Sequence, residues 1–312
     1  MADLSAKYLG LGLNSPIIVG SSNKINSIEE IKELEKSFAG AIVLNSIFQE
    51  HILNNPEPSI TEVPQKYSQE AIDYLTLISE AKKETSIPII ASFNCYSAGE
   101  WTNYLQNIQS AGADALEFNI FFSPNDKDFR ADDYEKVFLE IVTHIAHEIK
   151  IPISIKLSPY YTNLLNVVDQ LFYRGINGVV LFNDFFLPDI DLEELELIPA
   201  KNSNLYSNFN QTLRWTAIIS ASLPKIEISA NIDTIDCEHA IKLLLSGAHS
   251  IQIGPILKTK GLKHLKSFIE NISSWMNNKG FEKIEHIQGQ VNYNLIKDPF
   301  QFERNEFIKQ FS

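Results

Sequence analysis

The sequence contains few cysteines, an excess of acidic over basic residues, and no long apolar run. Its two cysteines, Cys95 and Cys237, lie far apart in the chain. Without a CxxC pair they do not suggest a zinc or iron–sulfur site, and so small a number suits a reducing compartment. The net charge of −13 argues against a surface for nucleic acid or for an anionic membrane.

The sequence also lacks the features of membrane insertion and secretion. No apolar stretch approaches the roughly 20 residues that are needed to span a bilayer. The first residues, Met-Ala-Asp-Leu-Ser, lack the apolar core of a signal peptide. Together with the charge and the cysteine content, these absences predict a cytoplasmic protein with no nucleic-acid partner, no membrane and no metal site.

Short runs rich in β-branched residues alternate with helix-like runs over most of the chain. We predict strands at residues 16–20, 41–44, 87–93, 115–120, 151–159, 178–183, 225–230 and 250–254. We predict helices at residues 28–38, 69–84, 99–110, 132–149, 164–173, 210–221, 234–245 and 262–277. Eight such alternations are typical of an α/β protein with a (β/α)₈ TIM barrel.

A doubly wound sheet is the main alternative to the barrel. Its first strand is usually followed by a GxGxxG turn, whereas here the first strand leads into Gly20-Ser-Ser-Asn-Lys24. We therefore predict one (β/α)₈ barrel domain over residues 1–312. Residues from about 280 to 312 are predicted to form a C-terminal tail that packs on the barrel.

The fifth predicted strand, Ile151–Pro159, carries a lysine. Its odd-numbered positions from Ile151 to Leu157 are apolar, which places Ser154 and Lys156 on the other face. A buried ammonium group is costly unless an anionic or strongly polar group meets it. Two interpretations stay open: a functional cation, or a lysine that reaches the rim of the barrel or pairs with a structural carboxylate.

Polar residues gather where the predicted strands end. In TIM barrels, binding and catalytic residues lie at the C-terminal ends of the strands. Those ends hold Gly20, Ser21, Ser22, Asn45, Ser46, Asn94, Asn119, Lys156, Asn183, Asn231, Gly254 and Pro255. A single asparagine there would most often cap a turn. Five asparagines with one lysine favour a site for a flat heterocycle, because amides donate and accept and a lysine stabilises developing charge.

The sequence resembles the dihydroorotate dehydrogenase-like flavoproteins. The segments that carry the resemblance are Tyr8–Ser22, Gly40–Ser46, Leu116–Asn119, Ile155–Pro159, Leu181–Asn183 and Leu213–Trp215. They occur in the family's order over nearly the whole chain. The first strand begins almost at once, so the chain resembles the soluble branch rather than the membrane-associated class with its extra N-terminal helices.

The resemblance implies an FMN-dependent oxidoreductase that acts on CH–CH donors. It would oxidise dihydroorotate, or a similar dihydropyrimidine, by hydride transfer to flavin N5 in pyrimidine biosynthesis, while a base removes the neighbouring proton. Lys156 would lie near the N1/C2-carbonyl edge of the flavin, where a cation favours the reduced form. The strand-end residues would hold FMN, its phosphate after the last two strands, and Asn119, Asn125 and Asn183 would bind substrate.

The sequence departs from the family at three places. The family's lysine at the end of the second strand is Asn45 here, and Asn231 and Ile232 stand where a phosphate loop usually has Gly-Gly. The catalytic base of the family is a cysteine or a serine, and Ser123 is the one candidate in the corresponding loop. Arg214 is a candidate for replacing lost phosphate contacts, because a guanidinium binds phosphate bidentately.

Ser123 and Arg214 also have structural interpretations, as a turn residue before Pro124 and as a surface ion-pair residue. Two functional alternatives stay open as well: a diverged family member that has lost FMN and acts as a binding or scaffold protein, or an FMN enzyme with another substrate. Barrels of this family often pair, so a homodimer is also open.

Overall fold

The structure, a computed structural model, describes most of the chain. The described residues are 2–21, 25–53, 67–97, 99, 101–121, 126–183, 188–199, 209–232, 236–254, 261–304 and 308–309.

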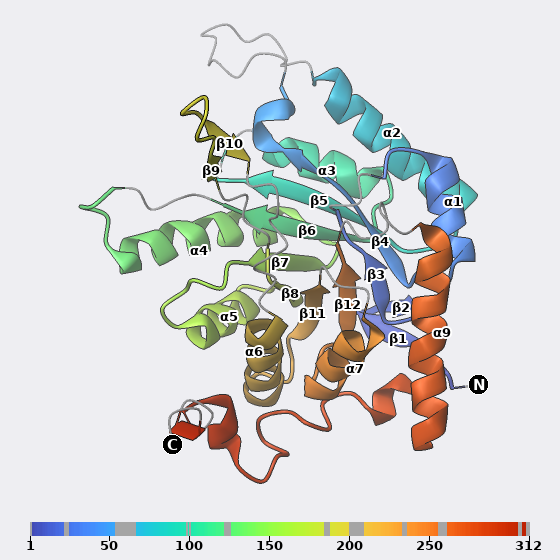
Figure 1. The fold of residues 1–312 in the computed structure, drawn as a ribbon. Helices are drawn as coiled ribbons and strands as arrows, with labels where there is room; N and C mark the ends of the chain where they lie inside the picture. Colours follow the sequence, from blue (N-terminus) through green and yellow to red (C-terminus); the bar gives the residue numbers. More distant parts are fainter. Residues whose placement is uncertain are drawn as a thin grey trace, which may run out of the picture.

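Eight parallel strands form a closed barrel within the described residues (Figure 1). They are β3 (Ile17–Val19), β4 (Ala41–Phe48), β5 (Ile89–Cys95), β6 (Ala115–Ile120), β7 (Ile153–Leu157), β8 (Gly178–Leu181), β11 (Glu227–Ile232) and β12 (Ser250–Ile253). They pair in chain order, and β12 closes the barrel against β3. The predicted (β/α)₈ fold is therefore confirmed.

Helices surround the barrel on the outside (Figure 1). They are α1 (Ile28–Lys36), α2 (Gln69–Glu84), α3 (Thr102–Ser110), α4 (Ala131–Glu148), α5 (Leu164–Tyr173), α6 (Phe209–Ser222), α7 (Cys237–Ser246) and α9 (Leu262–Lys279). Two of them show side-chain caps at their starts: the Ser27 hydroxyl accepts a hydrogen bond from Glu30 N at 3.3 Å at α1, and the Asn163 side chain accepts one from Asn166 N at α5.

The strands separate two apolar layers, because alternate side chains point to opposite faces. Outward residues such as Ile155 and Phe118 join the helices in one large core. A smaller core inside the barrel contains Ile18, Val43 and Ile90 together with Tyr8 and Leu9 from the N-terminal segment. The inner core therefore fills the N-terminal half of the barrel and leaves polar residues nearer the other end.

A hairpin that the sequence reasoning missed closes the N-terminal end of the barrel. It pairs β1 (Ala6–Tyr8) with β2 (Leu11–Leu13) through a two-residue turn. Leu9 and Gly10 both have positive φ, of 54° and 73°, as a type I′ turn requires. Leu9 tolerates this conformation because its side chain is buried and its N–H donates to the Glu227 carboxylate.

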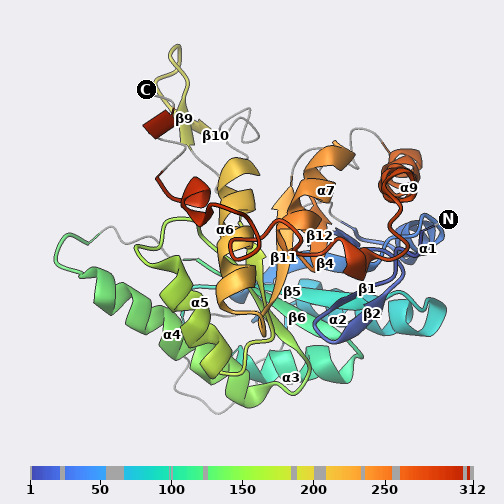
Figure 2. The same ribbon diagram turned by 90° about the horizontal axis from the view of Figure 1, so that it is seen from below.

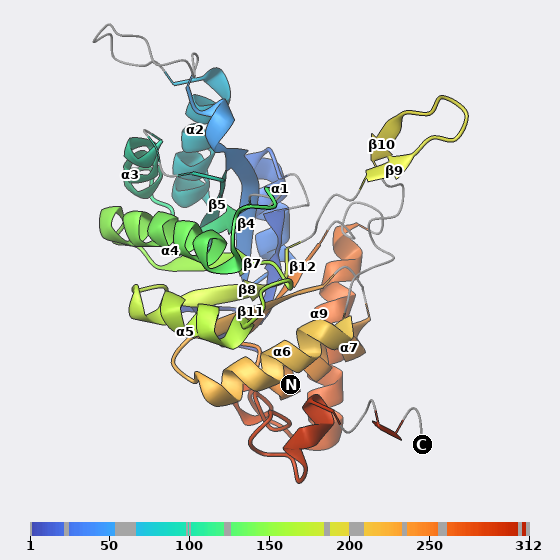
Figure 3. The same cartoon turned by 90° about the vertical axis from the view of Figure 1, so that its left-hand side faces the viewer.

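A second hairpin was also missed by the sequence reasoning. It pairs β9 (Pro188–Ile190) with β10 (Leu197–Pro199) and projects away from the barrel (Figure 3). Residues 281–304 follow α9 and lie below α6 and α7 in the view of Figure 1, which places them in front of these helices in Figure 2. Backbone hydrogen bonds join this segment to the helices, from Gly289 N to Leu244 O and from Tyr293 N to Ala217 O.

Candidate functional site at the C-terminal end of the barrel

Strand register places three of the predicted residues side by side. Asn94 on β5 is the register partner of Asn119 on β6, and Asn119 is the partner of Lys156 on β7. All three lie on the inward face, because alternation sends Phe93, Phe118 and Ile155 to the outer core. The C-terminal ends of three adjacent strands thus present two amides and one ammonium group to the same space.

Asn183 follows β8 and joins this group. Its backbone N–H donates to Leu157 O at 2.9 Å, and its side-chain Nδ2 donates to Asn119 Oδ1 at 3.2 Å. The Asn183 side chain is 8% exposed, yet its Oδ1 has no hydrogen-bond partner among the described residues. A buried acceptor without a donor is costly, so this oxygen is well suited to a ligand that brings an N–H or O–H group.

The Lys156 ammonium group is buried, with its residue 9% exposed. Two acceptors meet its Nζ within the described residues: Glu117 Oε1 at 3.5 Å and Gln252 Oε1 at 3.4 Å. Both contacts are long for charge-assisted hydrogen bonds, and an ammonium group has three protons to donate. Lys156 can therefore bind a further acceptor at the barrel mouth.

The opposite side of the mouth is formed by the ends of β3 and β12. Gly20 is buried and its N–H donates to Ile253 O at 3.0 Å. A Cβ atom at Gly20 would lie 3.1 Å from Ile253 O and 3.7 Å from Gln252 Oε1. The contact with Ile253 O is tight, so a side chain at Gly20 would require this backbone to shift, whereas the distance to Gln252 Oε1 is ordinary van der Waals contact. Ser21 is half-buried beside it, and Gly254 donates its N–H to Ile232 O.

Asn45 and Ser46 lie in a stretch of β4 where the register with β5 shifts. The Asn45 amide donates to Asn26 Oδ1, while the buried Asn45 Oδ1 has no partner in the part of the chain that the structure describes. Ser46 and Ser92 share a hydrogen bond of 2.7 Å between their hydroxyls. The position of the family's lysine is thus filled by an amide that still has a free acceptor.

The remaining predicted residues lie in different surroundings. Asn231, near the end of β11, donates its side-chain amide to Phe182 O at 2.9 Å. Ile232 is buried in the same strand, which fits its place in a continuous outer core. Arg214 is exposed on α6, with its guanidinium 5.8 Å from the ring centroid of Trp215. The structure therefore does not bring Arg214 to the amides around Lys156 by any described contact.

Four of the predicted site residues lie outside the described residues. They are Ser22, Ser123, Asn125 and Pro255.

Two residues that contact Lys156 were missed by the sequence reasoning. Glu117 is 1% exposed and Gln252 is fully buried, and both point into the barrel beside Lys156. A carboxylate inside the apolar run of a predicted strand is a signal that could have found Glu117, because buried charges need partners. Gln252 occupies the corresponding inward position of the run Ser250-Ile-Gln-Ile.

The residues around the mouth fit the ring end of FMN. An isoalloxazine carries carbonyl acceptors and an N–H donor along one edge. The Lys156 ammonium group can donate to a carbonyl, and the partnerless Asn183 Oδ1 can accept from the N–H group. Asn94 and Asn119 add further amides at the same level. Residues 233–235 and 255–260 lie outside the described part of the chain.

Comparisons with known proteins agree with this geometry. A family model described as Dihydroorotate dehydrogenase matches residues 3–203. The chain is 26% identical over 303 residues to "Dihydroorotate dehydrogenase B (NAD(+)), catalytic subunit" of Thermoplasma volcanium, which covers 93% of this chain and 98% of the relative. It is 24% identical over 323 residues to "Dihydroorotate dehydrogenase (fumarate)" of Saccharomyces cerevisiae, covering 93% and 99%. The protein of the same name from Lachancea kluyveri is 25% identical over 311 residues, covering 93% of this chain and 99% of the relative.

The comparisons confirm the predicted resemblance and, with it, the FMN-dependent oxidoreductase class of this family. None of the described helices is both long and apolar enough to cross a membrane. The described residues also contain no group of three or more His, Cys, Asp or Glu side chains placed to hold a metal ion.

Proposed function

This chain belongs to the dihydroorotate dehydrogenase family, and on that premise we propose that it oxidises dihydroorotate, or a similar dihydropyrimidine, in pyrimidine biosynthesis. When bound, FMN supplies the hydride acceptor for this reaction. The site is the mouth of the barrel between Lys156, Asn119, Asn183 and Gly20. We also propose that residues 1–312 form a single domain.

The protein's own residues would orient the reactants and hold charge. Lys156 would donate toward the ring edge that becomes negative on reduction, and its charge would stabilise the reduced state. Asn119, Asn125 and Asn183 bind the substrate's carboxylate and amide groups, and Ser123 takes the proton that leaves the substrate. The residues proposed to hold the cofactor are Gly20, Ser21, Ser22, Asn45, Ser46, Asn94, Asn119, Lys156, Asn183, Arg214, Asn231, Gly254 and Pro255.

The observation that carries the proposal is the combination of a buried cation and a buried free acceptor at one strand-end level. Lys156 Nζ has contacts of 3.4 and 3.5 Å, and Asn183 Oδ1 has no partner among the described residues. A buried donor and a buried acceptor that lack good partners both cost stability. A ligand that pairs with both would explain why the protein keeps them.

The first experiment is an absorbance spectrum of the protein purified without added flavin, repeated after addition of FMN and desalting. Flavin bands that survive desalting, followed by bleaching on anaerobic titration with dihydroorotate, are the expected result. Lys156→Ala is expected to lower the flavin content or to slow flavin reduction at least tenfold. Normal turnover by that variant would remove Lys156 from the site.

A scaffold function is the second candidate, and two observations favour it. Asn45, in the place of the family's lysine, pairs with Asn26, and Ile232 is buried where the family has glycine. A colourless protein that also fails to retain added FMN would support this candidate. Restoring glycine at Asn231 and Ile232 would then be expected to raise FMN affinity.

Assembly and location are further parts of the proposal. The T. volcanium relative is named a catalytic subunit, which motivates a search for a partner chain alongside the homodimer. We place the protein in the cytoplasm, on the basis of its acidic charge and its two cysteines, neither of which is in a disulfide. Sedimentation of the purified protein at several concentrations tests the homodimer.

A further inference from the structure

Three buried polar side chains form a closed triangle inside the barrel. Lys156 comes from β7, Glu117 from β6 and Gln252 from β12. Glu117 meets Lys156 Nζ at 3.5 Å, Gln252 Oε1 meets the same nitrogen at 3.4 Å, and Gln252 Nε2 donates to Glu117 Oε2. Since β12 is not a neighbour of β6 or β7 in the barrel, Gln252 reaches across the interior.

The triangle fixes the orientation of the glutamine amide. Its N–H₂ group faces a carboxylate and its carbonyl faces an ammonium group, so both contacts are attractive. The flipped amide would set N–H against N–H and oxygen against oxygen. Gln252 therefore has one stable orientation, and that orientation holds Lys156 at a fixed distance from Glu117.

Charge balance supports the same conclusion. An ammonium group and a carboxylate buried together cost far less than either alone, and removal of one partner leaves an uncompensated charge. Tyr8 lies in the same interior. Burial, and then the negative charge of Glu117, raise the pKa of Tyr8 well above its ordinary value, so this phenol stays neutral. The other carboxylate that acts on Tyr8 is that of Glu227, which accepts a hydrogen bond from Leu9 N at the hairpin turn.

We infer that Glu117 and Gln252 are positioning residues for Lys156: the carboxylate partly neutralises the cation offered to the flavin, and the amide holds it in place. This inference rests on the proposed function, because it concerns how Lys156 acts on bound FMN. Glu117 would weaken the preference of the site for reduced flavin, and Gln252 would keep the ammonium group at the ring edge.

The test compares two near-isosteric variants, Glu117→Gln and Gln252→Met, in FMN-loaded protein. Glu117→Gln leaves Lys156 uncompensated, so the midpoint potential of bound FMN should rise, and the equilibrium for flavin reduction should shift about tenfold toward the reduced form. Gln252→Met keeps both charges but frees the ammonium group, so FMN should dissociate about tenfold more readily with little change in potential. Ser250→Ala, which removes a buried hydroxyl pair with Ser229, is the matched control.

A second arm needs no flavin and separates the two proposals. In flavin-free protein, the double variant Glu117→Gln/Lys156→Met should unfold at a higher temperature than Lys156→Met alone, because it removes both buried charges. Wild-type protein that never binds FMN would overturn the proposed function, while this arm still tests the triangle. An unchanged potential in Glu117→Gln, or a double variant no more stable than Lys156→Met, would overturn the inference.

Discussion

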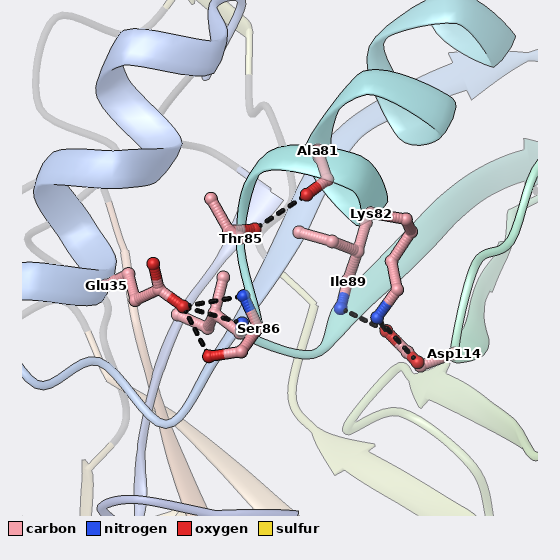
Figure 4. Close-up of polar contacts among 8 residues, drawn as sticks. Glu35, Ala81, Lys82, Thr85, Ser86, Ile89 and Asp114 are labelled. Carbon is pink, nitrogen blue, oxygen red and sulfur yellow. Dashed lines mark hydrogen bonds and ion pairs between the residues drawn. The ribbon is translucent and has the colours of Figure 1, made fainter.

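The two ends of the barrel treat their polar groups in opposite ways. At the N-terminal end, the carboxylates of Asp114 and Glu35 each accept several hydrogen bonds from neighbouring segments (Figure 4). Asp114 accepts from Lys82 Nζ at 2.7 and 2.9 Å and from Ile89 N at 2.7 Å. Glu35 Oε1 accepts from Ser86 N and Oγ at 2.7 Å and from Ile87 N at 3.0 Å.

At the C-terminal end, buried acceptors are left without donors. Asn45 Oδ1 and Asn183 Oδ1 have none among the described residues, and the contacts of Lys156 are long. Loss of a loop contact at the first end should cost stability alone. Loss of an amide at the second end should cost function with little loss of stability, because nothing within the protein depends on its free oxygen.

Two asparagines on opposite ends give the sharpest version of this comparison. Asn183→Leu removes the partnerless acceptor and is expected to lower kcat/KM for dihydroorotate about 100-fold, or about 2.7 kcal/mol of transition-state stabilisation. The lost oxygen leaves no donor unpaired, but the variant also removes the hydrogen bond from Asn183 Nδ2 to Asn119 Oδ1, so the free energy of unfolding should fall by no more than about 1 kcal/mol. Steady-state kinetics and urea unfolding measure the two quantities.

The matched control is Asn177→Leu at the N-terminal end. Asn177 Oδ1 accepts from Ile153 N at 3.0 Å at the start of β7, so this variant should lose about 1 kcal/mol of stability and keep its activity. Equal losses of activity in the two variants would show that the difference between the ends has no functional meaning.

Local sequence patterns predicted the barrel because each strand and helix carries its own period. They also predicted the strand-end residues, since parallel strands in a barrel bring those ends to one face. The patterns did not predict that Gln252 meets Glu117, because this contact depends on the closure of the barrel across its interior. They did not predict the environment of Arg214 either, since the face of α6 that turns outward is set by packing.

The missed hairpins have a related cause. β1 and β2 have three residues each, too few to show an alternating pattern, and their turn contains a leucine at positive φ. Leu9 is held there by burial in the barrel and by Glu227, more than 200 residues away in the chain. Propensity alone argues against such a residue at that position, so only the tertiary contact explains it.

Asp114→Ala tests the expected loss of stability at the N-terminal end of the barrel. It leaves Ile89 N and the half-buried Lys82 without their acceptor, and should lower the free energy of unfolding by about 2 kcal/mol. FMN content per folded molecule should not change. Glu84→Gln, which removes the exposed ion pair with Lys32, is the control and should cost clearly less stability than Asp114→Ala. If both variants lose a similar amount of stability, the contacts of Asp114 contribute no more than an exposed ion pair does.

The pH dependence of Glu35 gives the smallest expected effect. Burial pushes its pKa upward, but hydrogen bonds from Ser86 and Ile87 outweigh burial, so the pKa of Glu35 lies below its ordinary value of 4.5. A group with a lowered folded-state pKa stabilises the protein above the unfolded value and loses that contribution as the pH falls through the folded value. Wild-type protein should therefore lose slightly more stability than Glu35→Gln as the pH falls below about 4.5, by under about 1 kcal/mol because the site is partly solvated.

Urea unfolding at pH 7, 5, 4 and 3 measures this difference, with Glu33→Gln on the exposed side of α1 as the control. Parallel pH profiles for wild type and Glu35→Gln would show that the bonds to Ser86 and Ile87 do not depend on the charge.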